Sequence, residues 1–185
     1  IRDSGEVYLR QSDKTDKLKH DRILALQYDK GQRSYEDEIN QRFDTDDFNT
    51  DLFDKYREVM NSDISNEDIL NIRTGSNKKG YTNSAILMFA KNPEKYIPNS
   101  RVRFIRYEGT TQETGSRLNI VKEQNFEYPL PILIDEVRKL VQSQLRDFNS
   151  LDKNGKFISV PEYPEFAWLE GIVNAVVHRD YSITG

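Results

Sequence analysis

The feature that most constrains this chain is a polar stripe within its last apolar segment. Read as a helix that begins near Pro164, the segment places Glu170, Asn174 and His178 four residues apart, and such residues share one helical face. The remaining turns are aliphatic and would face a core, through Ile172, Val173, Val176 and Val177. Because unpartnered buried polar groups cost free energy, the stripe requires either a bound metal–nucleotide or an internal hydrogen-bond network.

The stripe has donor chemistry suited to a hard cation. Carboxylate and amide oxygens suit Mg²⁺, which keeps several waters and contacts nucleotide phosphates. Glu170, one turn before Asn174, would then serve as a general base toward water. The spacing by itself favours a plainer interpretation, a helix with a partly solvated polar side. The residues alone leave both interpretations open.

The composition limits the classes of function. The chain has 185 residues, enough for one medium domain or pieces of two. A net charge of −4 argues against strong binding of nucleic acid by the chain as a whole. The absence of cysteine excludes disulfides and thiolate metal sites and is compatible with the cytoplasm. No apolar run approaches the ~20 residues that span a bilayer, and a start without Met suggests a fragment of a longer protein.

Hydrophobic periodicity predicts an α+β fold with helices and strands in mixed order. Period-two alternation or β-rich composition predicts strands at 5–11, 39–43, 101–107, 118–127 and 156–160. Helical spacing and capping signals predict helices at 15–29, 50–60, 65–72 and 131–148, followed by the final helix. The apolar run 85–90 is too short to distinguish a helix from a buried strand.

Three other motifs receive plain interpretations. The run 178–180 reads His-Arg-Asp, but the chain lacks the other parts of a protein kinase. Residues 152–155 lack the ligand pattern of a calcium loop and predict a tight hairpin turn. One interpretation of the basic residues Arg101, Arg103 and Arg106 is contact with nucleic acid. The favoured interpretation is that they lie on the solvated face of a strand.

Several stretches together resemble one protein family. The family comprises bacterial and archaeal transcriptional regulators, often labelled as related to ATP-dependent DNA helicases. They join a Schlafen/AlbA-type DNA-binding domain to a divergent GHKL-type ATPase domain. The most specific match ends the chain, and the matching stretches are Val7–Arg10, Tyr81–Pro93, Ile97–Pro98, Arg101–Gly109, Tyr163–Ala175 and His178–Tyr181.

The resemblance implies a division of the chain into three parts. Residues 1–35 would be the tail of the AlbA/Schlafen-type DNA-binding domain, and residues 36–160 a connecting α+β region. Residues 161–185 would carry the N-box helix that opens an incomplete GHKL-type ATPase domain. The acidic and glycine-rich boxes that bind adenine and form the lid in this superfamily are not in the sequence.

The resemblance also implies roles for the last helix. Glu170 would polarise the attacking water as the catalytic base, and Asn174 would bind Mg²⁺. Asn174, His178 and Arg179 are the candidates for contacts with ATP. Two residues depart from the family pattern: Leu169 replaces the usual arginine, and Gly171 replaces the usual alanine. Glycine in place of alanine weakens a helix by ~1 kcal/mol.

The resemblance therefore predicts a cytoplasmic, DNA-binding regulator with an attached ATP-binding domain, without contact to a membrane. DNA would bind through the domain that precedes residue 36, ATPase activity is expected only in a longer protein, and this chain alone is expected to be inactive. The alternative is a non-enzymatic dimerisation or docking module with a degenerate nucleotide site. A homo-oligomer is compatible with either.

Overall fold

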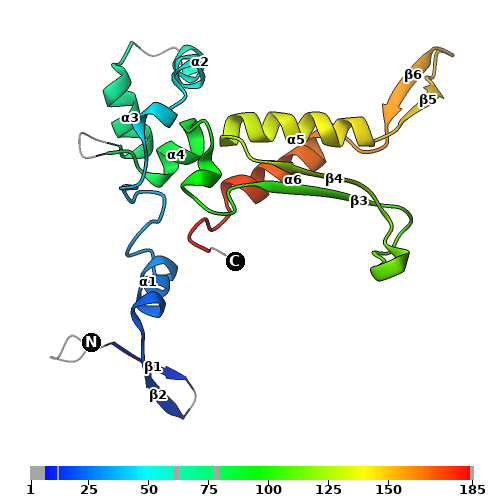
Figure 1. Ribbon diagram of the computed structural model, residues 1–185. Helices are drawn as coiled ribbons and strands as arrows, with labels where there is room; N and C mark the ends of the chain where they lie inside the picture. The colour runs from blue at the N-terminus through cyan, green and yellow to red at the C-terminus, as the bar shows by residue number, and fades with distance from the viewer. Residues whose placement is uncertain (1–6, 12, 61–62, 77–79, 184–185) are drawn as a thin grey trace.

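The computed structural model describes residues 7–11, 13–60, 63–76 and 80–183 (Figure 1). Within these ranges the helices α1 to α6 alternate with three antiparallel ribbons of two strands each. This arrangement confirms the predicted α+β class. In the described ranges, each helix is too short or too polar to cross a bilayer.

The N-terminal arm differs from its prediction. Strands β1 (Tyr8–Gln11) and β2 (Lys14–Lys17) form a hairpin, and helix α1 spans only His20–Asp29. The predicted helix start at Thr15 is therefore wrong, because Thr15 pairs with Arg10 in the hairpin. The segment 14–17 has no apolar residue that would favour a helix, so pairing with β1 decides its structure. Residues 5, 6 and 12 of the predicted strand and turn lie outside the described residues.

Helices α2 (Thr50–Met60) and α3 (Asn66–Thr74) form close to the predicted positions, and α3 also has the predicted cap at Ser65. The Ser65 side chain accepts a hydrogen bond from the backbone N–H of Asp68 at 3.2 Å, which satisfies one exposed donor at the start of α3. The 3₁₀ turn η1 (Thr45–Asp47) lies just before α2, whereas the predicted strand 39–43 is reduced to one bridge between Ile39 and Thr82. The two helices pack over a buried cluster made of Phe53, Ile69 and Phe89.

The apolar run 85–90, which the sequence left open between helix and strand, forms most of helix α4 (Asn83–Phe89) at the centre of the helical body. Thr82 caps it, because its Oγ1 accepts from the Ala85 N–H at 3.4 Å and donates to the Thr74 carbonyl at 2.5 Å. Ser76 completes this buried polar cluster by accepting from the Thr82 N–H at 3.1 Å. A cap with several partners therefore selects the helix over the strand for this apolar segment.

A short connection leads from α4 into the first long strand. The 3₁₀ turn η2 (Pro93–Lys95) is followed by a tight turn in which the Ser100 N–H donates to the Ile97 carbonyl at 3.2 Å. Pro98 and Asn99 hold its two central positions, and Asn99 has a φ of 63°. Proline followed by a residue with positive φ is the pattern of a type II turn. This turn directs the chain into β3 (Val102–Tyr107).

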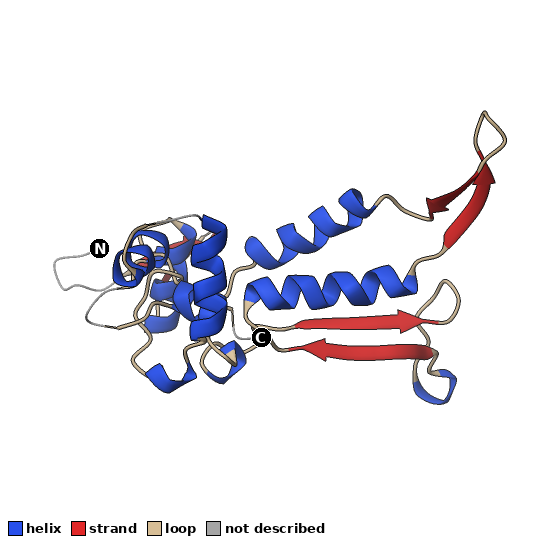
Figure 2. Ribbon diagram, turned by 90° about the horizontal axis from the view of Figure 1, so that it is seen from above, coloured by secondary structure: helices blue, strands red, loops and turns tan. Residues whose placement is uncertain are grey.

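After this turn, the chain forms a two-stranded ribbon that packs with two helices. Strand β3 pairs with β4 (Ile120–Phe126), and the 3₁₀ turn η3 (Gly115–Arg117) lies between them. Helices α5 (Leu130–Gln144) and α6 (Glu165–Val177) run beside the ribbon (Figure 2). Their shared core contains Val102, Phe104, Phe126, Leu133, Val137, Leu140, Ile172 and Val176.

The predicted helix 131–148 is too long at its end. Helix α5 stops at Gln144, and β5 (Asp147–Leu151) pairs with β6 (Phe157–Pro161) in a hairpin that projects from the body (Figures 1 and 2). Phe148 fits the helical spacing by coincidence and instead pairs with Val160. The tight turn expected at 152–155 is confirmed, since the Gly155 N–H donates to the Asp152 carbonyl at 3.0 Å.

Candidate functional site

Helix α6 is far more exposed than its sequence predicts. Only Val176 is buried, whereas Phe166 is 77% and Val177 54% exposed. The expectation that the aliphatic residues face a core is therefore wrong for Val177. The cause is that α6 packs on α5 along one side, and its other side has no cover in the described part of the chain.

Glu170 and Asn174 lie on the solvent-exposed side of α6. Within the described residues, neither side chain makes a hydrogen bond or an ion pair. In the part of the chain that the structure describes, the two side chains are not held in an internal hydrogen-bond network, and their exposure agrees with the plainer interpretation of a helix with a partly solvated polar side. What the structure presents is a carboxylate and an amide one turn apart, both open to solvent.

Two contacts fix the ends of α6. At its start, the Glu165 carboxylate accepts from Nε of Arg138 on α5 at 2.6 Å. At its end, the His178 N–H donates to the Asn174 carbonyl at 3.0 Å, so His178 is the capping residue rather than part of the last turn. Between these ends, Trp168 and Leu169 are half-buried.

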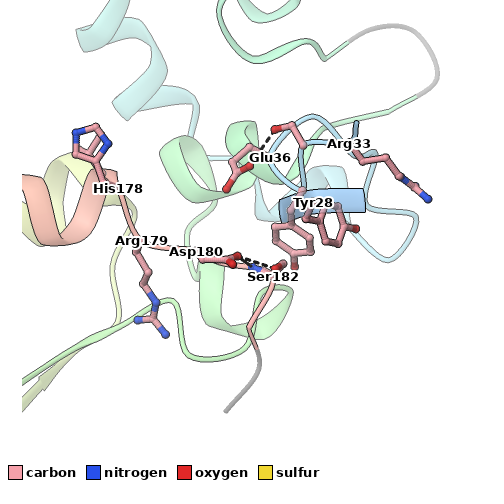
Figure 3. A pocket seen from close by; sticks show the side chains of 10 residues that line it. Tyr28, Arg33, Glu36, His178, Arg179, Asp180 and Ser182 are labelled. Atoms are coloured by element: carbon pink, nitrogen blue, oxygen red, sulfur yellow. Dashed lines mark hydrogen bonds between the residues drawn. The ribbon is translucent and has the colours of Figure 1, made fainter. Parts of the chain in front are cut away.

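A pocket of about 400 Å³ joins the end of α1 to the turn after α6 (Figure 3). Its first wall comes from the end of α1 and the segment that follows it, where the rings of Tyr28 and Tyr35 pack edge to face with centroids 6.2 Å apart. The Tyr35 carbonyl accepts from the side chain of Asn83 at 2.9 Å, which anchors this wall to α4. The full lining comprises Tyr28, Arg33, Ser34, Tyr35, Glu36, Val177, His178, Arg179, Asp180 and Ser182.

The two phenols of the first wall remain protonated hydroxyls. Burial raises the pKa of Tyr28, and its hydrogen bond to Glu38, at 2.9 Å, raises that pKa further. Burial likewise raises the pKa of Tyr35, with a further contribution from the negative charge of Glu38. Neutral phenols donate and accept hydrogen bonds, so this wall can recognise polar ligand groups but supplies no strong base.

The second wall contains two of the three predicted ATP contacts. His178 and Arg179 both line the pocket, yet their side chains point in different directions (Figure 3). The guanidinium of Arg179 donates to the Arg101 carbonyl at 3.3 Å, toward β3. Glu170 and Asn174 do not line this pocket. The four predicted site residues therefore divide into an exposed helix face and a pocket at the helix end.

The donor set on α6 fits a magnesium ion that retains most of its water. Glu170 and Asn174 supply two hard oxygens on one helix face. In the described ranges, no group of three or more His, Asp or Glu side chains is arranged to hold a metal. A Mg²⁺ ion bound here would therefore depend on water and ligand phosphates for its remaining coordination.

Sequence reasoning missed the first wall of the pocket. Tyr28, Tyr35 and Glu36 show no motif, and the turn at Gly31, where φ is 63°, brings the two aromatic residues together. Their proximity to residues 177–182 depends on the tertiary fold. No family model, curated protein or solved structure matches the chain.

Proposed function

We propose that this chain acts in a cytoplasmic, DNA-binding transcriptional regulator, in which helix α6 contributes to a Mg²⁺–ATP site. Asn174 would hold Mg²⁺ through its side-chain oxygen, and Glu170 would orient and deprotonate water near the terminal phosphate. The observation that carries the proposal is the pair of solvent-exposed, unpartnered side chains one turn apart on α6. Bound Mg²⁺ would supply charge neutralisation for the phosphates.

The pocket supports a route from nucleotide to DNA. One wall comes from the end of α1 and residues 33–36, at the end of the segment that resembles the tail of a DNA-binding domain. The other wall, 177–182, directly follows the helix with the proposed nucleotide ligands. A nucleotide that binds one arrangement of these walls more tightly would shift the population toward it. His178 lies at this junction and Arg179 beside it.

Calorimetry with Mg²⁺–ATP on the full-length protein tests the proposal. We expect saturable, Mg²⁺-dependent binding that Asn174→Ala weakens about tenfold or more, or ~1.4 kcal/mol. Asn125→Ala is the matched control, because Asn125 is also exposed and lies on β4. Equal binding by both variants would remove Asn174 from the site. If binding is intact, Glu170→Gln should lower phosphate release while leaving the affinity for Mg²⁺–ATP nearly unchanged.

A second function is favoured by the exposed apolar side of α6. Phe166 and Val177 lie on this helix with little cover, which is typical of a surface that binds another protein. On this alternative the chain is a non-enzymatic docking or dimerisation module. Absence of nucleotide binding, together with a dimer that Phe166→Ala dissociates in sedimentation experiments, would select it.

A further inference from the structure

A second hollow, of about 510 Å³, lies between the start of β3 and the turn after α6. Its volume is in the range of small-molecule sites. Three arginines from two distant segments of the chain meet there, together with one acidic residue. Its lining comprises Asn99, Arg101, Arg103, Arg179, Asp180 and Ile183. Glu170 and Asn174 do not line it, so the hollow is separate from the proposed magnesium ligands.

Arg179 is held in place without a carboxylate partner. Its guanidinium donates to the Arg101 carbonyl at 3.3 Å and lies 5.4 Å from the ring centroid of Tyr181. Tyr181 is buried, and its hydroxyl donates to the Val176 carbonyl at 2.8 Å, so the ring is a fixed platform. Arg179 forms no ion pair within the described ranges. A preorganised guanidinium loses little freedom when it binds an anion.

The acidic residue of the hollow is turned toward its own loop. One Asp180 carboxylate oxygen accepts from the Ser182 N–H at 2.9 Å and from the Ser182 hydroxyl at 2.6 Å. In Figure 3 the Asp180 side chain extends toward Ser182, while the Arg179 side chain extends away from both. One carboxylate oxygen is thus occupied by Ser182, and within the described residues Asp180 forms no ion pair with Arg179.

Arg103 on β3 and Arg101, just before the strand, bring further donors to the hollow. Each makes one surface ion pair, Arg101 with Glu94 at 2.6 Å and Arg103 with Glu123 at 2.7 Å. A guanidinium has five N–H donors, and one carboxylate engages at most two of them in a bidentate pair. Both side chains are about half exposed, so donors remain available to a ligand.

We propose that this hollow binds the phosphate or diphosphate group of a small molecule, with Arg179 as the central contact and Arg101 and Arg103 as flanking contacts. Planar guanidinium forks match the oxygens of phosphate, and three of them suit an anion with more than one charge. The site needs no Mg²⁺ and therefore does not depend on the α6 proposal.

The surrounding charges favour a small anion over a nucleic acid. Glu94, Glu123 and Asp180 lie beside the three arginines. A continuous polyanion would approach these carboxylates as well as the arginines, and such binding normally requires an uninterrupted basic surface. The chain as a whole is also acidic, with a net charge of −4.

Titration with inorganic pyrophosphate in Mg²⁺-free buffer, followed by calorimetry and by NMR, tests the proposal. We expect saturable binding with shifts at Arg101, Arg103 and Arg179, and Arg179→Gln should weaken it about tenfold or more. Arg179→Lys keeps the charge but loses the fork, so its affinity should lie between those of the wild type and Arg179→Gln. Arg103→Gln should weaken binding less than Arg179→Gln.

The matched control is Arg117→Gln, because the Arg117 side chain is 85% exposed and lies in η3. Unchanged melting temperatures will show that the variants are folded. Equal pyrophosphate binding by the wild type and Arg179→Gln would overturn the proposal, as would equal weakening by Arg117→Gln. Arginine-dependent binding of a DNA duplex without binding of pyrophosphate would also overturn it and assign the hollow to nucleic acid.

Discussion

Helix α4 and the β5–β6 hairpin both carry large apolar residues, but these residues are mostly buried on α4 and exposed in the hairpin. On α4, Ile86 and Phe89 are buried, as are three of the other five residues. In the hairpin every residue of both strands is exposed, including Phe148 and Phe157. Hydrophobic residues contribute to folding only when they lose contact with water, so similar side chains have very different expected effects on stability.

The contrast also concerns backbone and polar groups. The Thr82 and Ser76 hydroxyls tie the start of α4 to the end of α3. The hairpin depends mainly on its own ladder and on the local turn at Asp152. An isolated two-stranded hairpin is marginally stable in water. We therefore expect the body around α4 to unfold cooperatively, whereas the hairpin opens locally at lower free energy.

The largest expected effect on stability comes from removing a buried aromatic ring from the body around α4, compared with removing an exposed ring from the hairpin. Phe89→Ala should lower the free energy of unfolding by about 3–5 kcal/mol, because Phe89 is 1% exposed and packs edge to face on Phe53. Phe157→Ala is the matched variant, since Phe157 is 83% exposed. It should change stability by no more than about 0.5 kcal/mol. Urea denaturation followed by circular dichroism measures both, and equal losses would refute the contrast.

A smaller effect is expected from the polar cluster at the start of α4. Thr82→Val removes the hydroxyl that caps the helix and donates to the Thr74 carbonyl at 2.5 Å. Leaving buried partners unpaired should cost about 1–3 kcal/mol. Thr82→Ser retains the hydroxyl and should recover most of this loss, as measured by the same denaturation. If the serine variant is as unstable as the valine variant, methyl packing rather than the cap is responsible.

The smallest expected effect concerns two carboxylates, one in each region. Hydrogen bonds from Lys95, and to a lesser extent from Tyr96, lower the pKa of Asp47. The pKa of Asp152 is also lowered, mainly by the hydrogen bond that its carboxylate accepts from the Lys156 N–H. A lowered pKa in the folded state stabilises the protein above the unfolded value, and this contribution disappears as pH falls through the folded value. Below about pH 4, the melting temperature of Asp47→Asn should therefore fall less steeply with decreasing pH than that of the wild type.

Asp152→Asn is the control for this pH dependence. Its carboxylate stabilises the hairpin turn, and we expect the turn to open separately from the body. The global melting temperature of Asp152→Asn should therefore follow the wild-type pH profile. A flattened profile in this variant would indicate that the hairpin unfolds together with the body.

Local signals in the sequence predicted much of the body. The capping residue Ser65, the helical spacing of 50–60 and the alternation in 101–107 correctly placed α2, α3 and β3. Strand β5 was missed because its partner, β6, lies beyond a turn, and pairing across that turn overrides the helical spacing of Phe148. The strand at Lys14–Lys17 was missed for the same reason, since only β1 gives it a structure.

The candidate site was predictable only within one helix. Four-residue spacing placed Glu170 and Asn174 on one face of α6, as the structure has them. The same spacing favoured a partly solvated polar side, which the exposure of both residues matches. No signal in the sequence indicated that Phe166 and Val177 are exposed as well, because a sequence shows which residues are apolar and not what covers them. A turn and a contact with α4 place Tyr28 and Tyr35 at the pocket, and no sequence motif predicts either of these features.

The packing of α6 on α5 also provides a spectroscopic reporter. Trp168 is the only tryptophan of the chain, and it is half-buried on this helix, between the ion pair of Glu165 and the exposed Glu170. Its emission wavelength therefore depends on the water contact of one helix alone. A red shift that precedes the loss of helical circular dichroism would show α6 detaching while α2 to α4 remain folded, and ligands that hold α6 in place would delay that shift.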